Sequence, residues 1–310
     1  MTALAALAAV VDRFGPPEVI RVETVSVPAP GAGQVRIRVH AAGVGPRDVR
    51  LRSGRVVPRP RLPLVLGGEL AGDVESLGPD VASMQVGDAV FGITGESFLG
   101  ACAELAIADV SRIWRRPTML TSIEAAAVPV VACTALEMIE TAAATAGVRT
   151  LVLDAAGSVG AWLTALALGE GAGVAGLVPA DQAAEARRAG LRRVFTSLPT
   201  GSGPFDVVLD PVGGELARAA LRLLRPGGTL VSSVEVPEPA SVGRKDVSAR
   251  WVAGDVTSAR LGFLSRWIDA GWVAVSLGEV MPLRDAKIAH RKIEALAPHG
   301  PGRIVLRIHE

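Results

Sequence analysis

Residues 150–178, TLVLDAAGSVGAWLTALALGEGAGVAGLV, decide the fold of this chain. A short apolar run enters a turn of small residues, Asp154–Gly160, which is followed by an apolar helical pattern and a second apolar run, Val174–Val178. This order of strand, turn, helix and strand predicts a βαβ unit. Gly157 and Gly160 would let the backbone approach a pyrophosphate and let the helix pack on the strand, with the anion at the amino end of the helix.

The turn departs from the usual pattern of such turns at two positions. Gly or Ala is usual where this chain has Asp154, and Gly is usual where it has Ser158. A carboxylate would repel a pyrophosphate unless it turned away from it, and Asp often turns its side chain toward the backbone of its own turn. We therefore expect Asp154 to face the turn backbone, and Ser158 to add a hydroxyl donor at the start of the helix.

Composition narrows the class of protein. The 310 residues suit two domains, and a chain that is 49% hydrophobic and 20% charged is globular. A net charge of +1 argues against nucleic acid as the main partner. The two cysteines, Cys102 and Cys133, cannot form a disulfide framework, and we expect two buried thiols in a reducing compartment. We expect the segment MTALAALAAVV to be a first strand, and the protein to be soluble and cytoplasmic.

The chain changes character near residue 120. Residues 1–117 read as β-rich, and from about 120 helical patterns alternate with short apolar strands, as in a doubly wound parallel sheet. The expected elements are strands Gln34–His40, Glu69–Leu77 and Asp88–Phe91, helix Ile123–Ala144, strands Arg193–Phe195 and Phe205–Leu209, helix Gly214–Leu224, strand Thr229–Val234, a Pro/Ser-rich connection over 235–250, helix Ser258–Ala270 and a β-rich tail ending in Arg303–Ile308.

This order predicts two domains in an α/β fold, with the tail returning to complete the first. The expected boundaries are a β-rich domain of residues 1–120 completed by 271–310, and a parallel-sheet domain of residues 121–270. Residues 190–205 leave room for a third strand but not for a crossover helix, since such crossovers need a dozen or more residues.

Eight short motifs in order along the chain resemble the medium-chain dehydrogenase/reductase superfamily, in its zinc-independent branch of quinone oxidoreductases and enoyl reductases. They are Ala42–Asp48 with Arg52–Gly54, Leu66–Gly72, Val86–Gly92, Ala125–Pro129 through Thr134–Ala135, Phe205–Gly214, Leu224–Gly228, Met281–Leu283 with Ala289–His290, and Gly302–Leu306. The resemblance implies a GroES-like β-rich catalytic domain plus a Rossmann-type doubly wound parallel-sheet domain. It also implies NADPH as hydride donor, a quinone or activated alkene as acceptor, and a homodimer, with neither nucleic acid nor membrane as a partner.

The ligands of a catalytic zinc are missing. Zinc-dependent members of the superfamily place Cys and His where this chain has Gly45 and Gly68, and Glu69 alone cannot hold zinc, which needs three protein ligands around an open position. Cys133 falls about three residues out of register with a third ligand, by comparison with the spacing that such sites use. We therefore expect no metal, and reduction of a polarised C=C bond or a quinone by well-positioned reactants.

Similarity to the family also places the site residues. Arg50 stands where some relatives carry a Tyr, and Thr134 stands where a hydroxyl approaches the nicotinamide ribose, so both are candidates for catalysis. A proton could come from solvent, Arg50, Asp48 or Cys102, whereas His40 and His290 are expected in packing or surface roles. The expected cofactor contacts are Gly45, Pro46, Val130, Thr134, Gly157, Ser158, Val159, Gly160, Val178, Pro211, Val212, Gly213, Ser232, Ser233 and Arg303.

The end of the second strand favours NADPH over NADH. An NAD site usually has an acidic residue there for the ribose hydroxyls, but Ala175–Ala180 contains none. We expect Asp181, just beyond, to cap the helix Gln182–Ala189. Arg187 and Arg188 on that helix could reach a 2′-phosphate, although a solvated helix face is the simpler expectation.

Three functions remain open. The first is a zinc-independent, NADPH-dependent reductase of quinones or α,β-unsaturated carbonyls. The second is a relative whose cofactor site serves non-redox biosynthetic catalysis or partner binding, which Asp154, Gly45 and the missing phosphate-binding residues suggest. The third is a zinc dehydrogenase or an unrelated oxidoreductase, which would need ligands that the sequence does not show.

Overall fold

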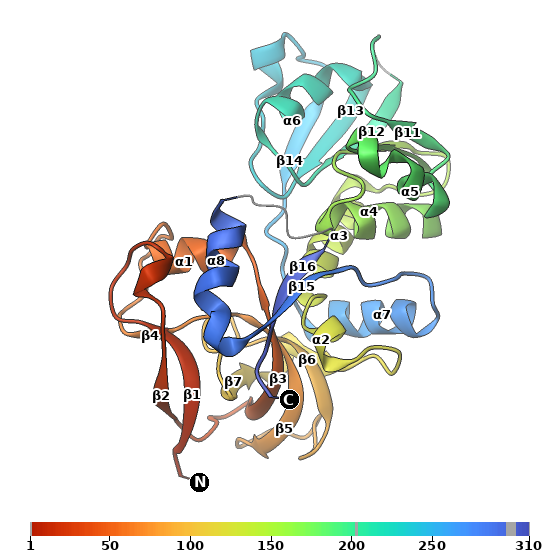
Figure 1. Cartoon of the computed structure of the whole chain (residues 1–310). Coiled ribbons are helices and arrows are strands. Elements are labelled where there is room, and N and C mark those ends of the chain that lie inside the picture. The colour runs from red at the N-terminus through yellow and green to blue at the C-terminus, as the bar shows by residue number, and fades with distance from the viewer. Residues whose placement is uncertain (1, 202–203, 296–301, 310) are drawn as a thin grey trace. The chain divides into compact units, whose positions relative to one another are not determined.

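The structure is a computed structural model that describes residues 2–201, 204–295 and 302–309. The chain forms two compact units (Figure 1). The first unit is Met1–Pro129 with Val256–Glu310, and the second unit is Val130–Asp255. The α/β class expected from the sequence is confirmed.

The first unit is built mainly from antiparallel strands, and only the pair β15–β16 is parallel among its described strands. Its seven-stranded sheet has the order β15-β16-β3-β5-β6-β8 with β7 also on β3, and a three-stranded sheet has the order β2-β1-β4. The elements are β1 (Leu4–Val11), η1 (Pro17–Val19), β2 (Arg21–Val27), β3 (Gln34–Val44), α1 (Pro46–Ser53), β4 (Leu64–Val65), β5 (Glu69–Leu77), β6 (Ala89–Ile93), β7 (Leu105–Asp109), η2 (Val110–Arg112), β8 (Ile113–Arg115), α2 (Ser122–Ala125), α7 (Ser258–Asp269), β15 (Leu277–Pro282), η6 (Leu283–Asp285), α8 (Ala286–Glu294) and β16 (Arg303–Arg307).

The tail of the chain does return to the first sheet. β16 pairs antiparallel with β3, so that Ile304 lies opposite Val44. Buried side chains from β3, β5, β16 and α8 share one apolar core, which is why the carboxyl-terminal segment cannot leave without exposing it. The tail is not purely β, because α8 lies between β15 and β16.

The second unit is a six-stranded parallel sheet flanked by helices. The strand order is β11-β10-β9-β12-β13-β14. The chain adds strands on one side of β9 up to β11 and then on the other side from β12, so the order of connection reverses between β9 and β12. Its elements are α3 (Pro129–Ala142), β9 (Arg149–Val152), α4 (Ser158–Gly169), β10 (Gly173–Leu177), η3 (Ala180–Gln182), α5 (Ala183–Arg188), β11 (Arg193–Phe195), β12 (Phe205–Asp210), α6 (Gly214–Ala220), η4 (Leu221–Leu223), β13 (Leu224–Ser232), η5 (Pro239–Val242) and β14 (Ser248–Trp251). In such sheets, ligands bind at the carboxyl ends of the strands near the reversal.

The boundaries of the two units differ from those expected. They fall at Pro129/Val130 and Val256, rather than at 120 and 271. The helix α7 belongs to the first unit because it packs on its strands: the indole of Trp114 lies against Gly262, and Asp269 accepts a hydrogen bond from Thr118 at 2.9 Å. Sequence periodicity identifies the helix but not the sheet that it covers.

Local expectations were mostly confirmed, with three corrections. The helix expected over Ile123–Ala144 is broken into α2 and α3 just before Pro129, whose ring cannot continue a helix. The segment 235–250 is not a plain connection, since it contains η5 and the start of the sixth strand, β14. Asp181 lies inside η3 and makes no side-chain capping bond, so its expected role as a helix cap is wrong.

Candidate functional site

The second unit gathers its expected cofactor residues at one edge of the sheet. Parallel strands end at the same edge, and the turns that leave four neighbouring strands carry these residues. Gly157–Gly160 follow β9, Val178 follows β10, Pro211–Gly213 follow β12, and Ser232 and Ser233 close β13. Val130 and Thr134 lie on α3, which belongs to the same unit.

The turn after β9 meets the geometric requirements of a pyrophosphate site. Gly157 is the amino-terminal cap of α4 and has no side chain to occupy the amides of the first turn. A Cβ on Gly160 would collide with the backbone of Asp154, so this glycine is needed for close contact between helix and strand. Orphan amides and the helix dipole together favour an anion here. The residues present therefore fit a dinucleotide.

Asp154 faces the turn, as expected. Its backbone is left-handed, with φ 49°, and its carboxylate lies directly against Gly157, where a Cβ would otherwise begin. The backbone amide of Gly157 donates to the carbonyl of Asp154 at 2.9 Å, which closes the turn. Burial raises the pKa of the Asp154 carboxyl. The carboxyl group thus lies beside the proposed anion site, and burial there favours its neutral, protonated form over its charged form.

The turn after β12 carries a second carboxylate. Asp210 is buried and accepts the amides of Val212 at 3.0 Å and Gly213 at 2.8 Å, which fixes the turn. The next amide, that of Gly214, donates to Glu235 at 2.9 Å. The amino end of α6 is therefore already matched by a carboxylate from the loop after β13.

Two of the expected contact residues have structural duties. Ser232 is fully buried, and its hydroxyl accepts the amides of Val234 at 3.1 Å and Glu235 at 3.3 Å. The Thr134 hydroxyl lies against Gly254, whose φ of 74° a side chain would not tolerate. The Ser232 hydroxyl thereby fixes the loop after β13, and the Thr134 hydroxyl packs against the loop after β14.

The first unit holds the remaining expected residues around an ion pair. Glu69, at the start of β5, is fully buried and pairs with Arg303, at the start of β16. The Arg303 guanidinium lies against Gly45, where a side chain would collide with it. Sequence reasoning singled out each of these three residues but not their contact, which joins segments distant in the chain.

The positions of the missing zinc ligands are filled by other side chains. The Arg303 guanidinium fills the space beside Gly45, and the Phe98 ring fills the space beside Gly68. Within the described ranges, 2–201, 204–295 and 302–309, no group of three His, Cys, Asp or Glu side chains could hold a metal ion. The positive charge beside Glu69 is thus a guanidinium of this chain.

Asp48 lies beside Gly45 in the first unit. It is 1% exposed, and its carboxylate accepts the amide of Gly45 at 2.8 Å. Burial raises its pKa to about 6, against the opposing effects of that hydrogen bond and of Arg303. Asp48 can therefore take up or release a proton near neutral pH, which a buried Cys102 cannot, because burial raises the pKa of that thiol well above its usual value.

Arg50 and the two histidines named from the sequence lie elsewhere in the first unit. Arg50 is exposed on α1, and Pro46 begins the same helix. His290 is fully buried, and burial lowers its pKa to about 3, so it remains neutral and serves packing, while His40 lies 2.8 Å from Asp73. Cys102 and Cys133 are buried, as expected.

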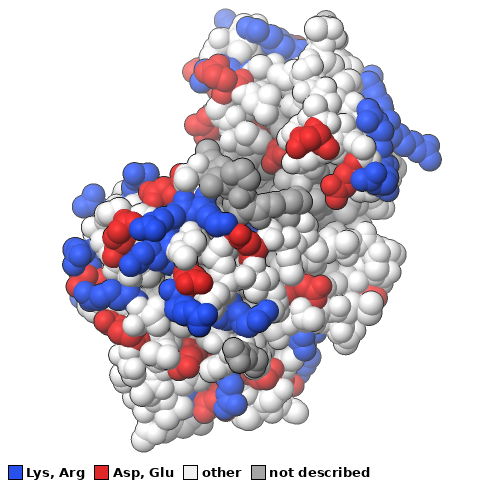
Figure 2. Space-filling view, viewed as in Figure 1, with Lys and Arg blue, Asp and Glu red and all other residues white. Residues whose placement is uncertain are grey.

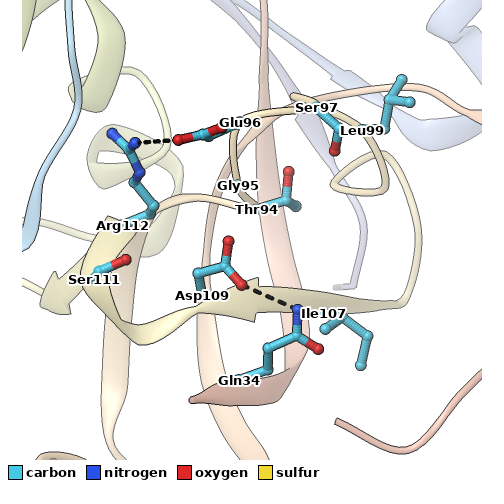
Figure 3. A pocket seen from close by; sticks show the side chains of 10 residues that line it. All are labelled: Gln34, Thr94, Gly95, Glu96, Ser97, Leu99, Ile107, Asp109, Ser111 and Arg112. Atoms are coloured by element: carbon cyan, nitrogen blue, oxygen red, sulfur yellow. Dashed lines mark hydrogen bonds and ion pairs between the residues drawn. The ribbon is translucent and has the colours of Figure 1, made fainter. Parts of the chain in front are cut away.

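A separate polar pocket opens in the first unit (Figure 3). It has a volume of about 500 Å³ and is lined mainly by β7 and the loop that follows β6. Its charged groups are already matched: Glu96 pairs with Arg112 at 3.1 Å, and Asp109 accepts from the amide of Gln34 at 3.0 Å.

Comparison with known proteins identifies the family. The alcohol dehydrogenase GroES-like domain family matches residues 31–118, and the zinc-binding dehydrogenase family matches residues 179–306. Quinone oxidoreductase of Mus musculus is 31% identical over 320 residues, covering 94% of both chains. The chain belongs to the medium-chain dehydrogenase/reductase superfamily, in its quinone oxidoreductase branch.

Two further similarities bear on the activity. The spectinabilin polyketide synthase system protein NorB of Streptomyces orinoci is 35% identical over 263 residues, which are 81% of this chain and 12% of NorB. The solved structure of mycobacterial Rv1454c complexed with NADPH has a TM-score of 0.83 and 29% identity, covering 98% of this chain and 100% of that one. These similarities support an oxidoreductase that uses a nicotinamide cofactor. Among its described residues, no helix is long and apolar enough to cross a membrane.

Proposed function

We propose that this protein is an NADPH-dependent, zinc-independent reductase of an α,β-unsaturated carbonyl compound or a quinone. One observation carries the proposal: a buried guanidinium, that of Arg303, stands against Glu69 and Gly45 where zinc-dependent relatives place metal ligands. A fixed cation without a Lewis-acid metal suits reduction of an already polarised acceptor better than alcohol oxidation.

The parts of the chain have distinct roles in this proposal. The nicotinamide cofactor supplies a hydride when bound. Gly157 and the first turn of α4 would hold its pyrophosphate, and Thr134 and Val212 lie at the same sheet edge for the rest of the dinucleotide. Arg303 is held by Glu69 as a buried positive charge, and Asp48 holds a proton with a pKa near 6.

The choice of NADPH depends on the second strand. Val178 follows β10 where an acidic residue would bind the ribose hydroxyls of NAD, and its side chain is buried and apolar. Asp181 lies in η3, beyond the end of the strand. A site without that carboxylate does not repel a 2′-phosphate at this point.

Titration of NADPH and NADH against the purified protein, followed by calorimetry, tests the proposal. We expect binding of NADPH at about micromolar concentration and weaker binding of NADH, as is common for nicotinamide enzymes. Gly157→Asp should abolish NADPH binding while the circular dichroism spectrum is retained. Gly173→Asp, at an exposed position on β10, is the matched charge control. Absence of NADPH binding at millimolar concentration would refute the proposal.

A second function is favoured by the two carboxylates at the cofactor edge. Asp154 lies against Gly157, and Glu235 accepts the amide of Gly214, so both glycine turns carry negative charge. A protein that used this edge for non-redox catalysis or for partner binding would need no exposed anion site. The same titration separates the two functions, because such a protein would not bind either nucleotide.

A further inference from the structure

One segment of the first unit is unusually basic. Residues 47–61, RDVRLRSGRVVPRPR, contain six arginines and a single carboxylate, that of Asp48, which is buried. The whole chain is nearly balanced, with 32 basic and 31 acidic residues. Five of the six arginines are exposed: Arg47, Arg50, Arg55, Arg59 and Arg61. We call these five residues the arginine segment. Its charge is a local property that the net charge of the chain conceals.

The arginine segment has no carboxylate partners within the described part of the chain. The Arg47 guanidinium lies 4.6 Å from the centre of the Phe98 ring and donates to the backbone carbonyl of Glu96 at 3.2 Å. Arg59 lies 5.9 Å from the Phe14 ring and donates to the carbonyl of Gly54 at 3.0 Å. Aromatic and carbonyl contacts orient a guanidinium without neutralising it, so the charge stays available to a partner.

Neighbouring basic residues, by contrast, are largely paired. On α8, Arg291 pairs with Glu18, and Lys292 pairs with Glu279 at 2.7 Å. Figure 2 shows Lys and Arg side chains gathered on the face of the first unit that carries α1 and α8. The arginine segment is thus an unneutralised part of that basic face. The screening length in physiological salt is about 8 Å. The electrostatic potentials of like charges that lie closer together than this length therefore add up.

An apolar residue stands among these charges. Val57 is 98% exposed. Within residues 47–61, all of which the structure describes, no other large apolar side chain is exposed. An exposed valine flanked in the sequence by Arg55 and Arg59 resembles the make-up of a protein interface, with an apolar centre and a charged rim. Nucleic acid would not use the valine, and a membrane would require a broader apolar face.

The segment adjoins the proposed active site in sequence and structure. It begins two residues after Gly45, against which Arg303 lies, and α1 connects the two. Resting on the proposed reductase function, we propose that the arginine segment docks an acidic carrier protein that presents the unsaturated acyl substrate as a thioester. Complementary charge would raise the encounter rate and orient the tethered acyl chain toward Gly45.

The test compares one acyl group on two handles. Crotonyl loaded on a bacterial acyl carrier protein is the acidic handle, and crotonyl-N-acetylcysteamine is the small neutral one. The variant is Arg55→Glu with Arg61→Glu, two residues outside the proposed catalytic machinery. The control is Arg38→Glu with Arg266→Glu, exposed positions elsewhere in the first unit that change the net charge equally. Carrier binding is measured separately by fluorescence anisotropy.

We expect the variant to lower kcat/KM for the carrier-bound substrate by about tenfold or more, mainly through KM, as loss of charge complementarity does. The neutral substrate and the control variant should be unaffected. Equal carrier binding by wild type and variant would overturn the docking proposal. So would an equal loss with crotonyl-coenzyme A, which would indicate a phosphate site, or charge-dependent binding to anionic vesicles or DNA in place of the carrier. Failure of wild type to reduce the neutral thioester would instead refute the reduction of unsaturated carbonyl compounds in the proposed function, since carrier binding is read independently.

Discussion

The Arg303 guanidinium occupies the space that a side chain on residue 45 would need, and Glu69 holds it there. Residue 45 is therefore glycine for a steric reason that involves the last strand of the chain. This relationship links the absence of a zinc ligand to the presence of a buried charge. It also makes residue 45 a sensitive position for both stability and activity.

Gly45→Ala should destabilise the protein by about 1–3 kcal/mol, because the new methyl group forces the buried guanidinium away from Glu69. Urea unfolding followed by circular dichroism measures the change. Gly173→Ala is the control, since a Cβ there would meet only a backbone oxygen at 3.7 Å. Equal stability of the two variants would show that Arg303 does not fill the space at residue 45.

Asp154→Asn should strengthen NADPH binding by about fivefold, since removing one negative charge near a pyrophosphate is worth ~1 kcal/mol. Asparagine also tolerates the left-handed backbone at this residue. Glu170→Gln, at the other end of α4, is the control. Calorimetric affinities that are unchanged in Asp154→Asn would mean that the carboxylate does not face the cofactor.

The pH dependence of NADPH binding offers a second view of Asp154. Burial raises its pKa, so the carboxyl gains a proton at a higher pH than an exposed Asp does. The affinity of wild type for NADPH should therefore rise as the pH falls through that pKa, and Asp154→Asn should not show this component. Identical pH profiles of the two proteins would contradict the assignment.

Asp48 should make folding stability depend on pH. Its pKa is about 6 in the folded protein against 3.8 as the ordinary value, so the folded state binds the proton more tightly. The contribution of this group to the free energy of unfolding is largest below pH 3.8. It is lost as the pH rises through about 6, and the loss amounts to up to ~3 kcal/mol. Asp48→Asn should remove this loss in urea unfolding at pH 5 and pH 7, whereas Asp181→Asn, at an exposed residue, should not.

We also expect a homodimer formed along the outermost strand of the second unit. β14 is an edge strand, and its Trp251 is 53% exposed, which leaves both backbone groups and an aromatic side chain available to a second copy. Light scattering should give twice the chain mass of 31.9 kDa. Trp251→Lys should shift the mass to that of the monomer, and a monomeric wild type at micromolar concentration would contradict the expectation.

Much of the fold was readable from the sequence because it depends on local pattern. The strand Glu69–Leu77 and the third strand Arg193–Phe195 have the expected limits, and α7 ends within one residue of its expected limit. The strand β14 was missed because only Ala249 of Ser248–Trp251 is a partly buried apolar residue, and edge strands lack the apolar run of buried ones.

The sequence by itself determined the βαβ unit, the order of the β-rich and parallel-sheet units along the chain, and the glycine turn after β9. These features follow from the spacing of apolar and small residues along the backbone. Only the tertiary structure decided that Arg303 meets Glu69 over Gly45, that Phe98 fills the space beside Gly68, and that Asp48 is buried enough to shift its pKa. These contacts join segments far apart in the chain. Their energies depend on burial and distance, which no local pattern records.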